Sequence, residues 1–419
     1  MNRVSNNSLL NACLGNLLEH YDTALFSFLS PFLAPLIFPK HDPIVALILT
    51  YALIPLGMLV RPLGSLVFGF IGDAFGRRQA LFLSLTGMAI VSTCIAFSPT
   101  YLQVGLLSPI IFCIGRVLQN FLAAGESMGG AIFLLENSSP KHHDFLSSIY
   151  NSSTLGGYLL ASLGVFTIGY YNVTDPGWRV LYLFGSLTAL FGSFMRITPL
   201  TKLSPITFSE TLDRLKNVVW TYRKPLFFII VSSGFAYATY TIALVLMNGF
   251  VPLISGHTKT EIMKVNTYLI LLDLCALPFF GWLASKVSRE KLMIGACLAV
   301  LFFAIPLFKS LEGASLTTVI LLRCSFVILG VAFFAPFHAW AAGLIPNNCR
   351  YGVISLGYAI GSQLLGSPTA ALSLWCFQKT GKISSVAWYW MALAAMTALT
   401  LWFTMRQKER FQIGELLHE

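Results

Sequence analysis

Five ionisable side chains lie within long apolar stretches of the sequence, where charges are rare. Glu19 and Asp22 belong to the first stretch, Arg61 to the second, and Arg116 and Glu126 to the fourth. A charge at the centre of a bilayer costs at least about 2.5–3.5 kcal/mol, so ionisable residues there usually have a function. A carboxyl group buried in apolar surroundings binds a proton more readily than one in water, and a guanidinium group binds anions. We therefore expect the three acids Glu19, Asp22 and Glu126 to line a wet central cavity that binds a small solute or a proton.

The spacing of these residues limits how they can interact. Glu19 and Asp22 are three residues apart, so on a helix they share one face. Arg116 and Glu126 are separated by about 15 Å of helix, because each residue adds about 1.5 Å, and they do not pair directly. A structural role is the alternative: Arg61 would neutralise Glu19, and Glu126, in a glycine-rich stretch, would join neighbouring helices.

Other polar residues in apolar stretches give weaker signals. The sequence leaves the roles of Asp273 and Arg323 open, and His20 is expected to be a packing residue. No other histidine lies beside carboxylates at the spacing of metal ligands, and the eight cysteines include no CxxC pair. We therefore expect neither a metal site nor a cofactor.

The elements that position these residues are membrane-spanning helices. Of the 419 residues, 56% are hydrophobic and 11% are charged, and the mean hydropathy is +0.74. A soluble protein would need more charge to cover its surface, so the excess apolar surface must meet lipid. Apolar runs long enough to cross a bilayer predict twelve spans and an all-α integral membrane protein. The predicted spans are 9–38, 44–71, 79–98, 102–135, 147–171, 179–198, 225–254, 265–285, 292–309, 316–345, 351–376 and 386–406.

A polar segment divides the spans into two sets of six. We predict an N-terminal six-helix bundle over 1–198, a cytoplasmic central loop over 199–224, a C-terminal six-helix bundle over 225–406, and a short cytoplasmic tail over 407–419. Lys and Arg concentrate on the side of the two termini, which predicts that both termini are cytoplasmic. This distribution accounts for the net charge of +10 without a nucleic-acid partner.

The loop after the second predicted span combines glycines, an acid and two arginines. These residues are Gly69, Asp73, Gly76, Arg77 and Arg78. The glycines allow close backbone approach, and the aspartate can cap a helix and accept hydrogen bonds from guanidinium groups. A weaker echo over 281–291 follows the eighth span, and duplicated six-helix halves are typical of many carriers.

This loop resembles the signature loop of the major facilitator superfamily, G-x-x-x-D-x-x-G-R-R. More narrowly, the chain resembles the metabolite:proton symporter branch, which includes proline/betaine, α-ketoglutarate, citrate and shikimate permeases. Gly15–Asp22 is similar to the branch's first-helix motif G-N-x-x-E-W-Y-D, with His20 in place of Trp. The stretch from Arg116 to Glu136 is similar to its R-x-x-Q-G-x-x-x-G-G-E helix, with Asn120 and Ala124 in place of glycines. Shorter matches occur at Arg61–Gly64, Trp178–Val180 and Gly357–Gly361.

The resemblance implies the major facilitator fold, with two pseudo-symmetric six-helix bundles in the plasma (inner) membrane. It implies a proton-coupled importer that works by alternating access, and no enzyme activity. Carried over by position, the substrate- and proton-binding residues are Glu19, Asp22, Arg61, Arg116 and Glu126. The cytoplasmic latch residues are Asp73, Arg77, Arg78 and Glu136, with Gly69 and Gly76 completing the loop.

Several functions remain possible on the sequence alone. A facilitator or metabolite antiporter without proton coupling would use the same scaffold, whereas a receptor would need an output domain and a membrane enzyme would need a constellation of catalytic groups. The expected partners are a small solute, protons and membrane lipid, with no nucleic acid and no obligate protein partner. Charges of both signs suit an amino acid or betaine as well as a dicarboxylate.

Overall fold

A computed structural model provides the structure of this chain. It describes residues 6–39, 42–64, 67–68, 71, 77–124, 143–194, 219–346 and 350–416. All regular elements in these residues are helical. The helices of the N-terminal part are α1 (Asn6–Ile37), α2 (Pro43–Met58), α4 (Arg77–Ala96), α5 (Tyr101–Val104), α6 (Leu107–Ala123), α8 (His143–Tyr170) and α9 (Thr174–Phe194).

The C-terminal part has longer and more interrupted helices. They are α11 (Arg223–Tyr240), η2 (Thr241–Leu246), α12 (Met247–Ser255), α13 (Lys259–Lys286), α14 (Arg289–Lys309), α15 (Leu316–Phe334), α16 (Phe337–Ala342), α17 (Arg350–Ile360), η3 (Gly361–Gly366), α18 (Thr369–Thr380), η4 (Ile383–Ala387) and α19 (Trp388–Leu416). The segments η2 and η3 are π-helical turns inside longer helices. Such turns are rare and are often found at functional sites.

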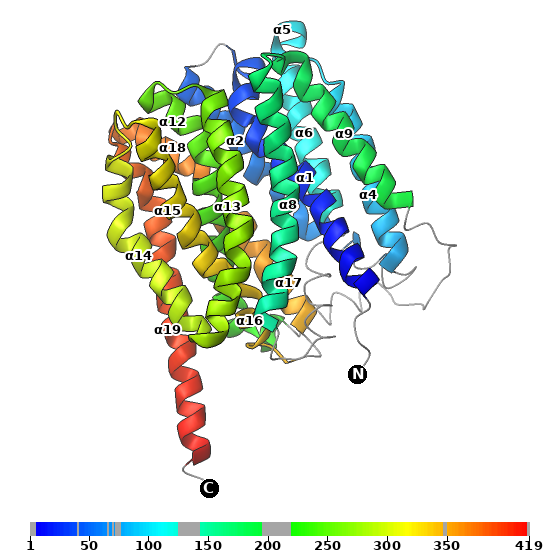
Figure 1. The fold of residues 1–419 in the computed structure, drawn as a ribbon. Helices are drawn as coiled ribbons and strands as arrows, with labels where there is room; N and C mark the ends of the chain where they lie inside the picture. The colour runs from blue at the N-terminus through cyan, green and yellow to red at the C-terminus, as the bar shows by residue number, and fades with distance from the viewer. Residues whose placement is uncertain are drawn as a thin grey trace.

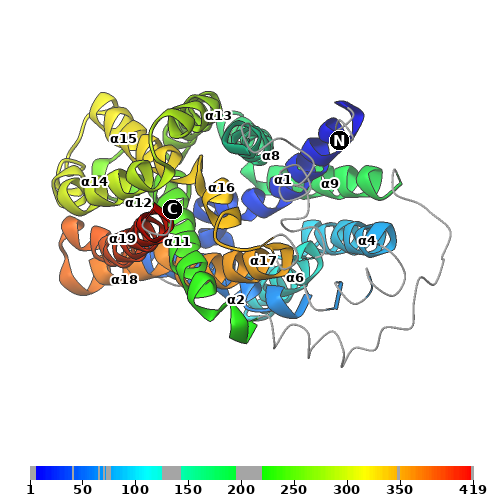
Figure 2. The same cartoon turned by 90° about the horizontal axis from the view of Figure 1, so that it is seen from below.

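The helices form two groups that lie side by side when the molecule is viewed along their axes (Figure 2). One group contains α1, α4, α6, α8 and α9, and the other contains α12, α14, α15, α18 and α19. Helix α8 of the first group packs along both α1 and α13, so α8 and α13 join the groups. Helix α1 begins and α19 ends at the same end of the molecule (Figure 1).

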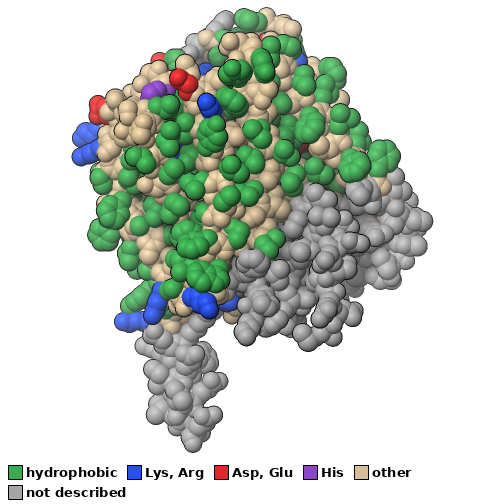
Figure 3. Space-filling model, viewed as in Figure 1, with side chains coloured by type: hydrophobic (Ala, Val, Ile, Leu, Met, Phe, Trp, Pro, Cys, Tyr) green, Lys and Arg blue, Asp and Glu red, His purple; other side chains and the backbone are tan. Residues whose placement is uncertain are grey.

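The flank of the molecule is apolar, as expected for a surface that meets lipid. Hydrophobic side chains cover the side between the two ends, and charged side chains gather near the ends (Figure 3). In the described part of the chain, seven helices are long and apolar enough to cross a membrane, and Phe82–Ala96 and Leu107–Ala123 form shorter apolar helices. The predicted membrane-spanning architecture therefore agrees with the surface of the structure.

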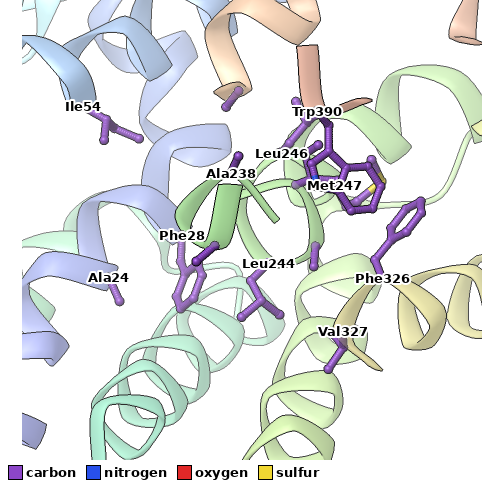
Figure 4. Close-up of a cluster of buried hydrophobic side chains, with 14 of the residues drawn as sticks. Ala24, Phe28, Ile54, Ala238, Leu244, Leu246, Met247, Phe326, Val327 and Trp390 are labelled. Atoms are coloured by element: carbon purple, nitrogen blue, oxygen red, sulfur yellow. The ribbon is translucent and has the colours of Figure 1, made fainter. Parts of the chain in front are cut away.

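The main hydrophobic core lies where helices of both groups meet. Phe28 of α1 and Ile54 of α2 belong to the same cluster of buried hydrophobic side chains as Leu244 of η2 and Met247 of α12 (Figure 4). Within the second group, the ring of Trp390 packs edge-on against Phe326 at 5.4 Å, and its indole N–H donates a hydrogen bond to Thr239. This packing fixes α11 against α15 and α19.

Several helix boundaries differ from the hydropathy windows by a few residues, and two of the differences are informative. Helix α13 begins at Lys259 rather than near 265, because Thr258 and Glu261 cap each other's backbone N–H groups at its first turn. The capped turn is polar, so a search for apolar runs does not include it. Helix α19 continues to Leu416, and most of the predicted tail over 407–419 is therefore a helical extension of the last span.

Candidate functional site

Asp22 is buried in the N-terminal group of helices, with 3% of its surface exposed. Its Oδ2 atom accepts a hydrogen bond of 2.6 Å from the hydroxyl group of Ser92 on α4. Its Oδ1 atom has no hydrogen-bond partner. Gly185 on α9 leaves room for the carboxyl group, because a Cβ atom at that position would overlap Oδ1. Helices α1, α4 and α9 therefore hold a buried acid with one free oxygen.

Arg116 is also buried and is joined to Asp22 through two side chains. Its Nη1 atom donates a hydrogen bond of 2.8 Å to Gln119 Oε1, and Gln119 Nε2 donates one of 2.9 Å to Ser92 Oγ. The guanidinium group lies 4.6 Å from the centre of the Phe26 ring, and its Nε and Nη2 atoms have no hydrogen-bond partner. We call Asp22, Ser92, Gln119 and Arg116 the buried polar relay.

The two charged ends of the relay interact without a direct ion pair. The charge of Arg116 acts on Asp22 electrostatically, but hydrogen bonds reach from one to the other only through Gln119 and Ser92. A cavity of about 10 Å³, with room for about one water molecule, touches Asp22, whereas the recess lined by both Asp22 and Arg116 is too narrow for a water molecule. Each end of the relay nevertheless keeps polar atoms that have no hydrogen-bond partner.

Arg61 lies on the same side of the site as Arg116. It belongs to a helical segment, 61–64, that continues from α2, and it is half-buried. Gly57 allows α2 to lie close to α6, since a Cβ atom there would be 2.9 Å from the carbonyl oxygen of Arg116. Arg61 and Arg116 interact electrostatically with each other and with the phenol of Tyr237 on α11. Two neighbouring guanidinium groups produce a positive region that suits an anionic ligand group.

The remaining predicted site residues fall outside the described part of the chain, wholly or in their side chains. Glu19 is a residue of α1, and Arg77 and Arg78 are the first residues of α4. The structure describes the backbone of these three residues but not their side chains. Gly69, Asp73, Gly76, Glu126 and Glu136 lie outside the described residues altogether. The roles assigned to these residues therefore stay predictions.

Asp273, whose role the sequence leaves open, is completely buried on α13. The hydroxyl group of Tyr240 donates a hydrogen bond of 3.3 Å to Asp273 Oδ1. A second buried acid thus lies in the C-terminal group of helices.

His20, expected to be a packing residue, donates a hydrogen bond of 2.7 Å from Nδ1 to the carbonyl oxygen of Asn16, and its ring lies 6.1 Å from that of Tyr158.

Arg323, whose role was also open, is completely buried on α15. Its guanidinium group donates to the carbonyl oxygens of Ala243 at 3.0 Å and Ile262 at 3.3 Å, and to the side chains of Asn248 at 2.9 Å and Asn266 at 2.6 Å. It therefore joins η2, α12 and α13 to α15.

Two members of the relay were not assigned a role from the sequence. Gln119 follows Arg116 by three residues, and this spacing places the two on one helical face, which was a usable signal. Ser92 is a single hydroxyl group in an apolar run and gives no such signal. Among the described residues, no group of three or more His, Cys, Asp or Glu side chains lies close enough to hold a metal ion.

Comparisons with known proteins give the family context of this geometry. A family described as "Sugar (and other) transporter" matches residues 9–206. The chain is 28% identical over 410 residues to a putative proline/betaine transporter of Staphylococcus aureus (strain COL), covering 93% of this chain and 86% of the relative. It is 28% identical over 405 residues to the citrate-proton symporter of Klebsiella pneumoniae, covering 94% and 90%.

Solved structures agree with the fold. The crystal structure of a D-xylose-proton symporter superposes with a TM-score of 0.72 at 16% identity, covering 94% of this chain and 96% of the other. A proton:xylose symporter of the major facilitator superfamily superposes with a TM-score of 0.67 at 17% identity, covering 94% of both chains.

The chain is a membrane transporter with the major facilitator fold. The resemblance inferred from the sequence motifs and the predicted fold class are therefore confirmed. The family and the relatives named above are transporters and not enzymes.

Proposed function

We propose that this transporter couples proton movement to the uptake of a small zwitterionic or organic-acid metabolite by alternating access. The observation that carries the proposal is the buried polar relay, in which an acid and a guanidinium group share a hydrogen-bonded path but keep free atoms. Relatives named as proline/betaine transporters and a citrate-proton symporter support both the solute class and the proton.

Physical chemistry explains why such a relay would couple two ligands. A free buried charge is costly, and the cost grows when the surrounding cavity closes and excludes water. A proton on Asp22 removes one charge, and a substrate carboxylate beside Arg116 neutralises the other. Because Ser92 and Gln119 join the two groups, loading one end changes the hydrogen bonds available at the other. The closed state then has a lower free energy with both the proton and the substrate bound than with only one of them.

The same proposal includes the predicted orientation and gate. Both termini face the cytoplasm, the bundles over 1–198 and 225–406 move against each other, and Glu19 and Glu126 complete the cavity. The signature-loop residues and Glu136 act as the cytoplasmic latch. The positive-inside distribution of Lys and Arg and the common end of α1 and α19 support this orientation.

Uptake into proteoliposomes tests the coupling. Radiolabelled proline, betaine and citrate are offered with an imposed pH gradient, acid outside, and with a protonophore as control. We expect the wild-type protein to accumulate at least one solute against its gradient and Asp22→Asn to lose accumulation by at least about tenfold while keeping solute exchange. Glu312→Gln changes an exposed acid in the turn between α14 and α15 and is expected to transport normally.

Two results would contradict the proposal. Accumulation by Asp22→Asn at the wild-type level would show that Asp22 does not carry the coupled proton. A wild-type protein that exchanges solutes but does not respond to the pH gradient would be a facilitator or an antiporter.

A further inference from the structure

A second buried acid in the C-terminal group of helices lacks a positively charged partner. Asp273 is completely buried, its Oδ1 atom accepts the hydrogen bond from Tyr240, and its Oδ2 atom has no hydrogen-bond partner. In the part of the chain that the structure describes, no Lys or Arg forms an ion pair with it. An ionised carboxylate in this position needs a positive charge from elsewhere, because burying it alone is costly.

Aromatic rings from several helices surround Tyr240, the partner of this acid. The Tyr240 ring lies 5.4 Å from Phe334 in an edge-on arrangement, and its phenol interacts electrostatically with those of Tyr158 and Tyr358. The His338 ring lies 5.4 Å from Phe334 and 6.1 Å from Tyr358. Tyr158 belongs to α8, so rings from both groups of helices lie around Tyr240, the residue that contacts the acid.

Aromatic rings near a carboxylate are the chemistry that recognises an organic cation. The face of an aromatic ring attracts ammonium groups, and the attraction is about 2 kcal/mol or more where the cation is desolvated. At Asp22, by contrast, the carboxylate is bound by a serine hydroxyl group within a hydrogen-bonded relay. The aromatic surroundings of Asp273 therefore suit an alkylated ammonium group.

Two tyrosines of helix α11 connect this acid with the positive region of the N-terminal group. Tyr237 and Tyr240 are three residues apart and share one helical face, about 5–6 Å apart at Cβ. Tyr237 interacts electrostatically with Arg116, whereas Tyr240 donates to Asp273. The π-helical segment η2 begins at the residue after Tyr240, and such turns often occur at functional sites. A region for an anion and a region for a cation thus lie beside consecutive tyrosines of one helix.

We infer that Asp273 and the aromatic rings around Tyr240 form a subsite for the cationic nitrogen of a compact zwitterionic substrate, whose carboxylate lies toward Arg116. The inference rests on the proposed transport function and narrows its substrate class. A dicarboxylate would bring a second negative charge to Asp273, and the repulsion between the two charges opposes its binding. The subsite therefore selects zwitterions over organic acids.

Equilibrium binding to the purified full-length protein in nanodiscs tests the subsite without any pH gradient. The probes are betaine, proline, citrate and the carbon isostere of betaine, in which a tert-butyl group replaces the trimethylammonium group. We expect the wild-type protein to bind betaine at least about tenfold more tightly than the isostere, which corresponds to about 1.4 kcal/mol. Because this comparison uses only the wild-type protein, it does not depend on the folding of a variant.

Variants then assign the discrimination to the acid. Asp273→Asn is expected to lower the ratio of betaine affinity to isostere affinity, with the aromatic rings keeping part of the preference. Asp175→Asn, which changes an exposed acid at the start of α9, is expected to keep the wild-type ratio. The inference is overturned if the wild-type protein binds the isostere as tightly as betaine, prefers citrate, or binds no zwitterion. It is also overturned if Asp273→Asn keeps the wild-type ratio. Failure of gradient-driven uptake with intact betaine selectivity would instead contradict only the proton coupling.

Discussion

A single methyl group at residue 185 should disrupt the position of Asp22. Gly185 lies in α9 directly beside the carboxyl group, and an alanine Cβ atom would overlap Oδ1 and lie 3.1 Å from Cγ. The carboxyl group would have to move away from α9, and the hydrogen bond of 2.6 Å from Ser92 would be lost or stretched. Gly185→Ala therefore tests the geometry of the relay without changing any of its members.

The free-energy change can be worked out by comparing this variant with a second glycine of the same helix. Gly192 lies two turns further along α9, and a Cβ atom there would meet only the end of the flexible Leu85 side chain, at 3.3 Å. Replacing a helical glycine by alanine stabilises a helix by about 1 kcal/mol, so Gly192→Ala should be neutral or stabilising. At Gly185 the same gain opposes about 1–3 kcal/mol of overpacking and about 1.5–3 kcal/mol for a lost hydrogen bond to a charged group. The net loss is about 1.5–5 kcal/mol.

Thermal unfolding of the two purified variants in detergent measures this difference, and proteoliposome uptake measures its effect on transport. Gly185→Ala should unfold at a lower temperature than the wild-type protein and lose at least about tenfold in gradient-driven uptake, while Gly192→Ala should match or exceed wild-type stability. If the two variants have the same unfolding temperature and transport equally well, Asp22 does not lie against α9 and the proposed geometry of the relay is wrong.

Two further predictions concern contacts away from the relay. Arg323→Met leaves several buried acceptors without their donor, and each costs about 1–3 kcal/mol of stability. The variant should therefore unfold at a clearly lower temperature than the wild-type protein, whereas Lys309→Met, at an exposed position, should not. Equal stability of the two variants would contradict a structural role for the guanidinium group of Arg323. Tyr51→Phe removes a hydrogen bond of 2.9 Å to the carbonyl oxygen of Val245, which joins α2 to η2 across the two groups of helices. It should weaken the contact between α2 and η2 by about 1 kcal/mol and increase thiol labelling of a cysteine introduced in place of a residue next to Val245. Unchanged labelling would show that this bond does not help to hold the two groups of helices together.

The sequence predicted the residues of the relay better than their arrangement. Asp22 and Arg116 were identified because charges are rare in apolar stretches, and the structure places both in the interior. The sequence could not show that Ser92 joins them, since a hydroxyl group on a separate helix has no periodic relation to either. Contacts between helices depend on the rotation of each helix about its axis and on its depth in the membrane, and hydropathy determines neither of these.

The same limits explain the differences in the C-terminal part. Asp273 was recognised as unusual, but its aromatic surroundings come from helices distant in sequence and were not foreseen. The π-helical segments η2 and η3 have no distinctive composition, so the apolar pattern predicts an ordinary α-helix at these positions. The start of α13 was predictable from the Thr258–Glu261 capping pair, which a search for apolar runs ignores.

The two buried acids lead to one physical argument about coupling. Each carboxylate keeps an oxygen without a hydrogen-bond partner, and neither forms a direct ion pair among the described residues. An uncompensated charge near the bilayer centre costs at least about 2.5–3.5 kcal/mol. Arg116 partly compensates Asp22, but Asp273 forms no ion pair among the described residues, so closing the cavity with both acids ionised is disfavoured. A proton alone neutralises one acid, and a zwitterion alone brings a cation to the other. Only the doubly loaded carrier removes both penalties, and a carrier that closes in this state moves proton and substrate together.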